Sequence, residues 1–134
     1  MIGLDTNVLI HFFLQDDAEK GEKGKKASEL MSTLTVAEPG WVGTPVLIDL
    51  VWEMTHTHKI KRIGVIQILD QLLSSQEITV QNSDTVREAL RLYRSRNTEF
   101  ADCLIACSAK AAGCSRTVTF DRRAARDAGM ELLG

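Results

Sequence analysis

The chain has 134 residues, of which 44% are hydrophobic and 25% are charged, and its formal net charge is −2. This is the composition of one ordinary globular domain, so we expect a single domain over residues 1–134. No apolar run approaches the ~18–20 residues that a bilayer-spanning helix needs. The apolar N-terminus has no basic stretch before it, which argues against a signal peptide. The expected location is therefore the cytoplasm.

The first part of the chain is predicted to alternate a short strand with helices. Ile2–Leu4 is predicted as a buried strand, and Thr6 as the cap of a helix that begins at Asn7. The polar stretch 16–26 is expected to form a loop or a broken helix start. A helix over Ala27–Leu34 follows.

The central helix has the clearest start signal. Thr44 is a predicted cap and Pro45 suits the first helical position. Apolar residues then recur at the i, i+3, i+4, i+7 spacing of one buried helix face. This face consists of Leu47, Leu50, Val51 and Met54.

Strands and helices continue to alternate toward the C-terminus. The pattern predicts a helix over 63–73, a strand over 77–80, a helix from Ser83 or Asp84 to Arg94, a helix that Asn97 or Thr98 caps and Gly113 ends, a strand over 117–120, a helix over 122–128 and a strand over 130–133. The buried face of the helix before Gly113 is predicted as Phe100, Leu104, Cys107 and Ala111. Such alternation indicates the α/β class, with a central, mostly parallel sheet covered by helices on both faces.

Two acidic residues follow predicted strands directly. Asp5 comes after the first strand, and Asp121 comes after the strand near the C-terminus. In open α/β sheets, sites form in the crevice beyond the carboxyl ends of the strands. If these two strands are parallel neighbours, both carboxylates point into one crevice.

Two further acids, Asp49 and Asp102, lie on predicted helices among apolar residues. A buried carboxylate needs a partner, although Asp5 and Asp121 could simply cap helices and Asp49 could face solvent. Carboxylates that converge repel one another unless a cation neutralises them. Oxygen ligands suit Mg²⁺ or Mn²⁺, which activate water for attack on phosphodiesters.

The remaining polar chemistry of the chain is less specific. The three histidines are scattered and are not expected to bind metal, and the three cysteines (Cys103, Cys107 and Cys114) are expected to be buried free thiols. Since the net charge is negative, any nucleic-acid contact must come from local basic patches. The candidates, each of which could also be a solvated helix face, are Lys59, Lys61 and Arg62; Arg91, Arg94 and Arg96; and Arg116, Arg122, Arg123 and Arg126.

Four segments together resemble a known family. They are DTNVL near the N-terminus, PVLIDLVWEM in the central helix, EFADCLIA and TVTFD. Their order resembles that of PIN-domain ribonucleases, and they are most similar to the VapC-type toxins of bacterial toxin–antitoxin pairs. The resemblance covers nearly the whole chain and implies a three-layer α/β/α sandwich. It assigns Asp5, Asp102 and Asp121 to an acidic metal site. It places the supporting polar residues at Thr6, Asn7 and Thr119.

The sequence departs from this family at two acidic positions. The central-helix acid is usually glutamate, but the matching position here is Asp49, whose carboxylate is ~1.5 Å shorter in reach. Glu53, one helical turn on, is the alternative for this role. Glu99 stands where many relatives have aspartate, one turn before Asp102.

The resemblance implies a Mg²⁺- or Mn²⁺-dependent endoribonuclease in which the four acids, Asp49 included, are catalytic, and Arg122 and Arg123 grip RNA phosphates. It also implies a neutralising antitoxin and a homodimer, for which an exposed apolar surface could come from Leu69, Leu72, Leu73, Trp41 and Trp52. Three other interpretations compete. One is a catalytically impaired binding module, because Asp49 replaces glutamate. The others are a haloacid-dehalogenase-like phosphohydrolase, disfavoured because Asn7 stands at its second acid, and a receiver-type module.

Overall fold

The structure is a computed structural model that describes residues 1–14 and 21–134. Its residues fall into two compact units, Met1–Gln81 and Asn82–Gly134, which we call the N-terminal unit and the C-terminal unit. None of the helices within the described ranges combines the length and apolar character that a bilayer-spanning segment needs. The polar stretch 16–26 was predicted as a loop or a broken helix start, and residues 16–20 of it lie outside the described ranges.

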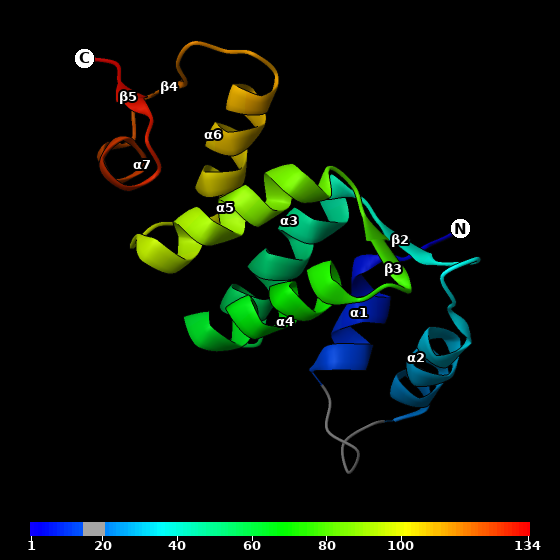
Figure 1. Cartoon of the computed structure of the whole chain (residues 1–134). Helices are drawn as coiled ribbons and strands as arrows, with labels where there is room; N and C mark the ends of the chain where they lie inside the picture. Colours follow the sequence, from blue (N-terminus) through cyan, green and yellow to red (C-terminus); the bar gives the residue numbers. More distant parts are fainter. Residues whose placement is uncertain (15–20) are drawn as a thin grey trace. The chain divides into compact units, whose positions relative to one another are not determined.

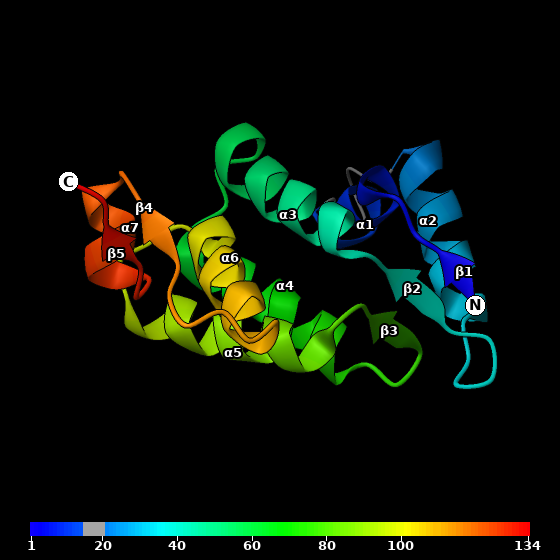
Figure 2. The same ribbon diagram turned by 90° about the horizontal axis from the view of Figure 1, so that it is seen from above.

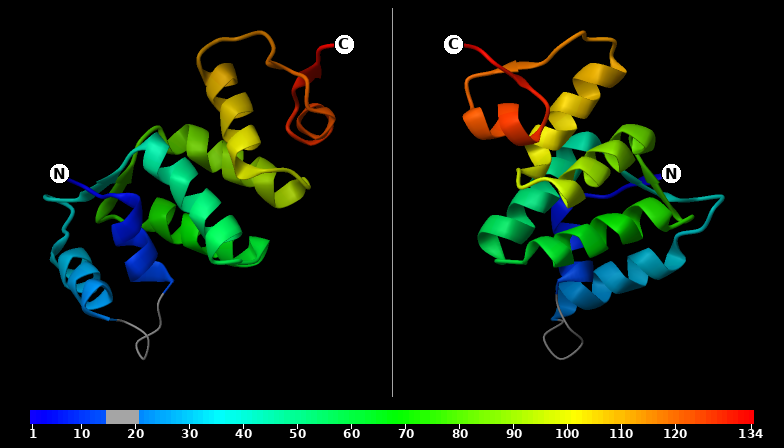
Figure 3. Two further views of the ribbon diagram at one scale, coloured as in Figure 1. Left: turned by 180° about the vertical axis from the view of Figure 1, so that it is seen from behind. Right: turned by 60° about the vertical axis from the view of Figure 1, so that its left-hand side comes forward.

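A three-stranded parallel sheet organises the N-terminal unit. Its strands β1 (Ile2–Gly3), β2 (Gly40–Val42) and β3 (Ile78–Val80) lie side by side in that order (Figures 1 and 2). The helices of the unit are α1 (Thr6–Phe13), α2 (Glu22–Thr33), α3 (Thr44–Trp52), a π-helix η1 (Glu53–Thr57) and α4 (Arg62–Ser74). Helices α1 and α2 pack against each other, as the left view of Figure 3 shows. Parallel strands joined through helices confirm the predicted α/β class.

The central strand β2 was missed by the sequence reasoning, and Gly40 explains why it can form. A Cβ atom on Gly40 would lie 2.8 Å from Cδ1 of Leu4 and 2.9 Å from Cδ1 of Leu34. Since both leucines are buried, only glycine lets the backbone approach them this closely. The strand therefore depends on packing partners that are distant in the sequence.

The central helix buries the predicted face. Leu47, Leu50, Val51 and Met54 are all at most 7% exposed. After Trp52 the helix continues as η1, where the backbone N–H of His58 donates to the carbonyl of Glu53 at 3.0 Å. The continuation was not predicted, and π-helical turns are frequent at functional sites.

The C-terminal unit combines a helix pair with a small parallel sheet. Helices α5 (Ser83–Ser95) and α6 (Phe100–Ala111) pack together, with the rings of Tyr93 and Phe100 edge to face at 5.6 Å. Strand β4 (Val118–Thr119) pairs in parallel with β5 (Glu131–Leu132), and α7 (Arg122–Asp127) packs on both. Ala106 of α6 packs against a small core cluster formed by Ala124, Ala128 and Met130.

Several predicted details are corrected by the structure. The helix expected from Ala27 already begins at Glu22, and the caps are Asp5, Gly43, Asn82 and Glu99 rather than the neighbouring residues predicted. Ala111 and the thiol-bearing Cys114 are exposed, whereas Cys103 and Cys107 are buried as expected. Leu69 and Leu72 belong to the core and cannot form an exposed apolar surface. Trp41 and Leu73 are half-buried, so Trp52, at 54% exposed, is the accessible member of that set.

Candidate active site

Asp5 lies between β1 and α1 and caps the helix. Its Oδ1 accepts a hydrogen bond from the backbone N–H of Thr6 at 2.7 Å, and its carbonyl accepts from Val8 at 3.2 Å. Thr6 is buried, whereas Asp5 and Asn7 are exposed. The acid predicted at the carboxyl end of the first strand is therefore accessible to a ligand.

Asp49 and Glu53 lie one turn apart at the end of α3 and the start of η1. Asp49 is exposed and Glu53 is half-buried. Residues four apart share one helix face, so both carboxylates leave the helix on the side opposite its buried face. Neither side chain therefore packs in the core, and both residues stay candidates for the catalytic acid of the central helix.

The acids of the C-terminal unit gather around Asp102. Burial is the main cause that raises the pKa of Asp102 above its ordinary value, and the neighbouring carboxylates of Asp121 and Glu99 raise it further. The guanidinium of Arg123 acts in the opposite direction and lowers it. The structure thus brings three predicted site acids and one predicted site arginine together. That Asp5 and Asp49 act with them stays a prediction.

Both the side chain and the backbone N–H of Asp121 make hydrogen bonds. Its Oδ1 accepts hydrogen bonds from the backbone N–H groups of Arg123 at 2.8 Å and Ala124 at 3.3 Å, so Asp121 caps α7. Its own N–H donates to the hydroxyl of Thr119 at 3.0 Å. The hydroxyl of Thr119 therefore helps to fix the position of Asp121.

Arg123 has a role that sequence reasoning missed. Its Nε donates to the carbonyl of Asn97 at 2.9 Å, and its Nη2 donates to Oδ1 of the same residue at 3.2 Å. Asn97 precedes α6, so this pair ties the start of α7 to the segment before Glu99 and Asp102. No local pattern signals the contact, because the two residues are 26 apart in the sequence.

The donor chemistry fits a hard divalent cation. Asp102 has two carboxylate neighbours, and a bound cation offsets such repulsion. Carboxylate oxygens are also the ligands that Mg²⁺ and Mn²⁺ prefer. Within the described residues, however, no group of three or more His, Cys, Asp or Glu side chains is placed where it could hold a metal ion. The acids are divided between the units, with Asp5 and Asp49 in one and Asp102 and Asp121 in the other.

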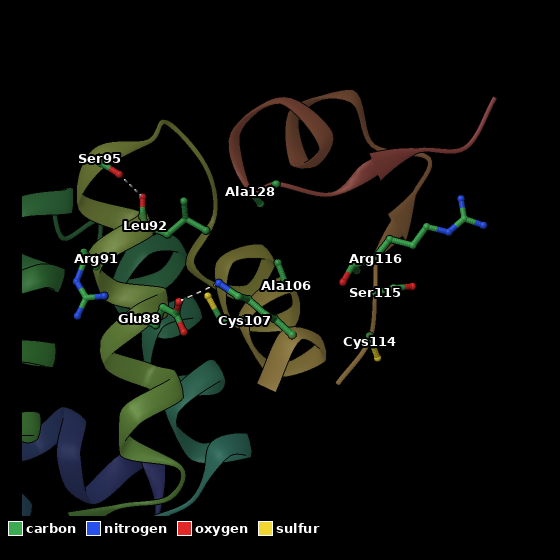
Figure 4. Close-up of a pocket in the computed structure, with 13 residues that line it drawn as sticks. Glu88, Arg91, Leu92, Ser95, Ala106, Cys107, Cys114, Ser115, Arg116 and Ala128 are labelled. Carbon is green, nitrogen blue, oxygen red and sulfur yellow. Dashed lines mark hydrogen bonds and ion pairs between the residues drawn. The ribbon is translucent and has the colours of Figure 1, made fainter. Parts of the chain in front are cut away.

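A cavity of about 690 Å³ lies in the C-terminal unit, away from these acids. Its walls come from α5, the second half of α6, the segment 114–117 and the end of α7 (Figure 4). Lys110 in its lining contacts Glu88 at 3.5 Å, and Arg116 pairs with Glu131 at 2.9 Å. Lys110 and Arg116 are thus each paired with an acid, and Arg91 is a third cation in the lining.

The chain has a counterpart among known protein families. A model of the PIN domain family matches residues 2–129, so the match spans both units and the chain belongs to the PIN domain family. The resemblance found in the sequence motifs is thereby confirmed, and with it the α/β sandwich class.

The chain is also similar to a curated protein of this kind. The chain is 33% identical over 120 residues to a VapC ribonuclease of Aquifex aeolicus (strain VF5). The alignment covers 90% of this chain and 87% of the relative. The similarity to VapC-type proteins therefore extends over almost the whole length of both chains.

Proposed function

We propose that this chain is a metal-dependent endoribonuclease whose catalytic acids are Asp5, Asp49, Asp102 and Asp121. Family membership and the VapC ribonuclease relative support a nuclease. The observation that carries the proposal is the grouping of Asp102 with Asp121 and Glu99: burial is the main cause that raises the pKa of Asp102, and these two carboxylates raise it further. Neighbouring carboxylates repel one another, and a bound cation would offset that repulsion.

The chain's own residues would divide the work of RNA hydrolysis. Asp5, Asp102 and Asp121 would hold Mg²⁺ or Mn²⁺, which when bound supplies a Lewis acid that activates water and stabilises the leaving oxygen. Thr119 and the start of α7 fix the position of Asp121. Arg122 is exposed beside it and is the better candidate to contact a phosphate, because Arg123 is engaged with Asn97.

We further propose that the whole chain acts as one PIN domain and as the toxin of a toxin–antitoxin pair. A small antitoxin would bind it with an apolar helix and place an arginine or similar group near the acids. The toxin would form a homodimer, as the resemblance implies. Size-exclusion chromatography of the lone chain tests this point, and a monomer at high micromolar concentration contradicts a stable dimer. The cytoplasmic location stays a prediction.

Incubation with total RNA followed by end-mapping tests the activity. We expect discrete cleavage ends with Mn²⁺ or Mg²⁺, no cleavage with EDTA, and no cleavage by the Asp102→Asn variant under any condition. Asp84→Asn is a matched control, because Asp84 lies in the first turn of another helix, α5, and is fully exposed. Cleavage by Asp102→Asn equal to wild type contradicts the proposal.

The presence of Asp49 where relatives carry glutamate favours one alternative, a PIN-like protein that binds partners without cutting RNA. Calorimetric titration with Mn²⁺ separates the two functions. Binding at micromolar to low millimolar concentration supports the enzyme, whereas absence of binding at millimolar concentration supports the alternative.

A further inference from the structure

The outward face of the central helix carries aromatic as well as acidic side chains. Asp49, Trp52, Glu53 and His56 follow the i, i+3, i+4, i+7 spacing and so share one face. Trp52 is 54% exposed although tryptophan is usually well covered. The opposite face is core, so this tryptophan has no role in packing it. An exposed indole beside a candidate catalytic acid is available to contact a ligand.

The indole is held in place by a second ring. The rings of Trp52 and His56 are stacked, with centroids 4.7 Å apart and planes inclined by 14°. Nδ1 of His56 lies 2.9 Å from the hydroxyl of Thr55, and that hydroxyl donates to the carbonyl of Val51 at 2.9 Å. The tryptophan is therefore preordered, which lowers the entropy lost when a flat ligand binds it.

Two exposed lysines follow this face in the sequence. Lys59 and Lys61 follow the π-helix and are both exposed, and the chain turns at Lys59, whose φ is 55°. Because the chain as a whole carries a net charge of −2, such local cations are where phosphate contacts must come from. Proteins that bind unpaired nucleic acid combine aromatic side chains with positively charged groups.

We propose that Trp52, supported by His56, is a platform on which one unpaired base of the RNA substrate stacks next to Asp49. The proposal rests on the ribonuclease function proposed above. RNA-binding proteins commonly recognise splayed bases by stacking them on aromatic rings. Stacking tolerates any base, so the platform would position the strand relative to the acids without reading its sequence.

The test combines a protein variant with an RNA variant. Wild type, Trp52→Ala and Trp52→Phe are compared on a single-stranded RNA oligonucleotide and on versions with one abasic nucleotide at each position in turn. Base–aromatic stacking is worth ~1–3 kcal/mol per base, so we expect Trp52→Ala to weaken binding in EDTA and to raise KM by about tenfold. Trp52→Phe should retain most of the affinity, and kcat should hardly change.

One abasic position should correspond to the base that stacks on Trp52. There, the loss of affinity caused by Trp52→Ala and the loss caused by the missing base should not add, because either change alone removes the same stacking contact. In a Trp41→Phe background Trp52 is the sole tryptophan, and its fluorescence should be quenched by intact RNA but not by that abasic RNA. Val36→Ala, an exposed apolar residue of the same unit, should have no effect.

The outcomes separate this inference from the function on which it rests. Unchanged KM and affinity in Trp52→Ala, with wild-type cleavage still metal-dependent, overturns the platform and leaves the ribonuclease standing. Absence of metal-dependent cleavage by wild type overturns the ribonuclease itself. If Trp52→Ala disrupts a dimer or antitoxin binding but not RNA binding, the face belongs to a protein partner and the platform is likewise overturned.

Discussion

Asp121 should have two separable roles, as the cap of α7 and as a metal ligand. Its Oδ1 accepts hydrogen bonds from the N–H groups of Arg123 and Ala124. Asparagine keeps a side-chain oxygen that can accept the same bonds, whereas alanine has none. Asp121→Asn should therefore preserve the cap and remove the charge, and Asp121→Ala should remove both.

The expected magnitudes differ for the two roles. Loss of an aspartate cap costs ~0.5–2 kcal/mol, typically about 1 kcal/mol. For a chain of this length, that lowers Tm by roughly 2–5 °C. We therefore expect Asp121→Ala to unfold a few degrees below wild type and Asp121→Asn to unfold close to it. Both variants should lose metal-dependent cleavage, because both lose the carboxylate.

Thermal unfolding in EDTA, followed by circular dichroism, measures the first role, and Mn²⁺-dependent cleavage of RNA measures the second. Asp84→Asn serves as the control for both assays and should change neither. Equal destabilisation by Asp121→Asn and Asp121→Ala refutes the capping role. Undiminished cleavage by Asp121→Asn refutes the ligand role, whatever its stability.

Three further predictions concern single residues. Asp102→Asn should abolish cleavage and leave the Tm of the metal-free protein unchanged or higher, because the repulsion from Asp121 and Glu99 disappears; a lower Tm in EDTA would contradict this reasoning. Asp49→Asn should lower the cleavage rate at least about 100-fold, and Glu53→Gln should lower it much less; the reverse order in a single-turnover assay would identify Glu53 as the central acid. Met54→Ala should cost ~2–5 kcal/mol in urea unfolding, because Met54 is fully buried and its removal leaves a cavity.

Helix interiors were predictable from the sequence because their periodicity reflects local geometry. The face through Leu47 and Met54 is buried as its spacing requires. The start of α2 was displaced by five residues and the other helix caps by one or two, since capping depends on backbone conformation that neighbouring polar residues do not reveal. At α5, Asn82 takes the cap with a φ of 51° although Ser83 and Asp84 follow it directly.

Strand β2 and the partners of each strand were not predictable in this way. β2 has only three residues, and its pairing with β1 and β3 involves segments almost forty residues away on either side. β4 pairs with β5 in the C-terminal unit, so within the described residues the strands before Asp5 and Asp121 are not paired with each other, and the condition under which both acids would share one crevice is not met by strand pairing. Strand pairing is a nonlocal property that a short apolar run does not encode.

The sequence pointed to neighbouring acids but not to the contacts that hold them. Asp102, Asp121 and Glu99 were singled out from motif and spacing and are close enough to interact. That they form the catalytic site stays a prediction. The hydrogen bonds between Arg123 and Asn97 were not predicted, because each residue could equally have been an ordinary solvent-exposed or helix-capping residue. Side chains that carry chemistry leave a pattern in the sequence, whereas those that position them depend on tertiary structure.

The placement of the acids explains how the chain can carry them before a cation binds. Asp5, Glu99 and Asp121 are the N-caps of α1, α6 and α7, and Asp102 lies in the first turn of α6. Free N–H groups at helix starts carry partial positive charge that stabilises carboxylates. Asp5 and Asp121 thus accept hydrogen bonds from the starts of their own helices, and Glu99 and Asp102 lie where the partial positive charge of α6 favours a carboxylate. For Asp102 this interaction opposes the effect of burial and of the carboxylates of Asp121 and Glu99, all of which disfavour its charged form and which a bound cation would offset.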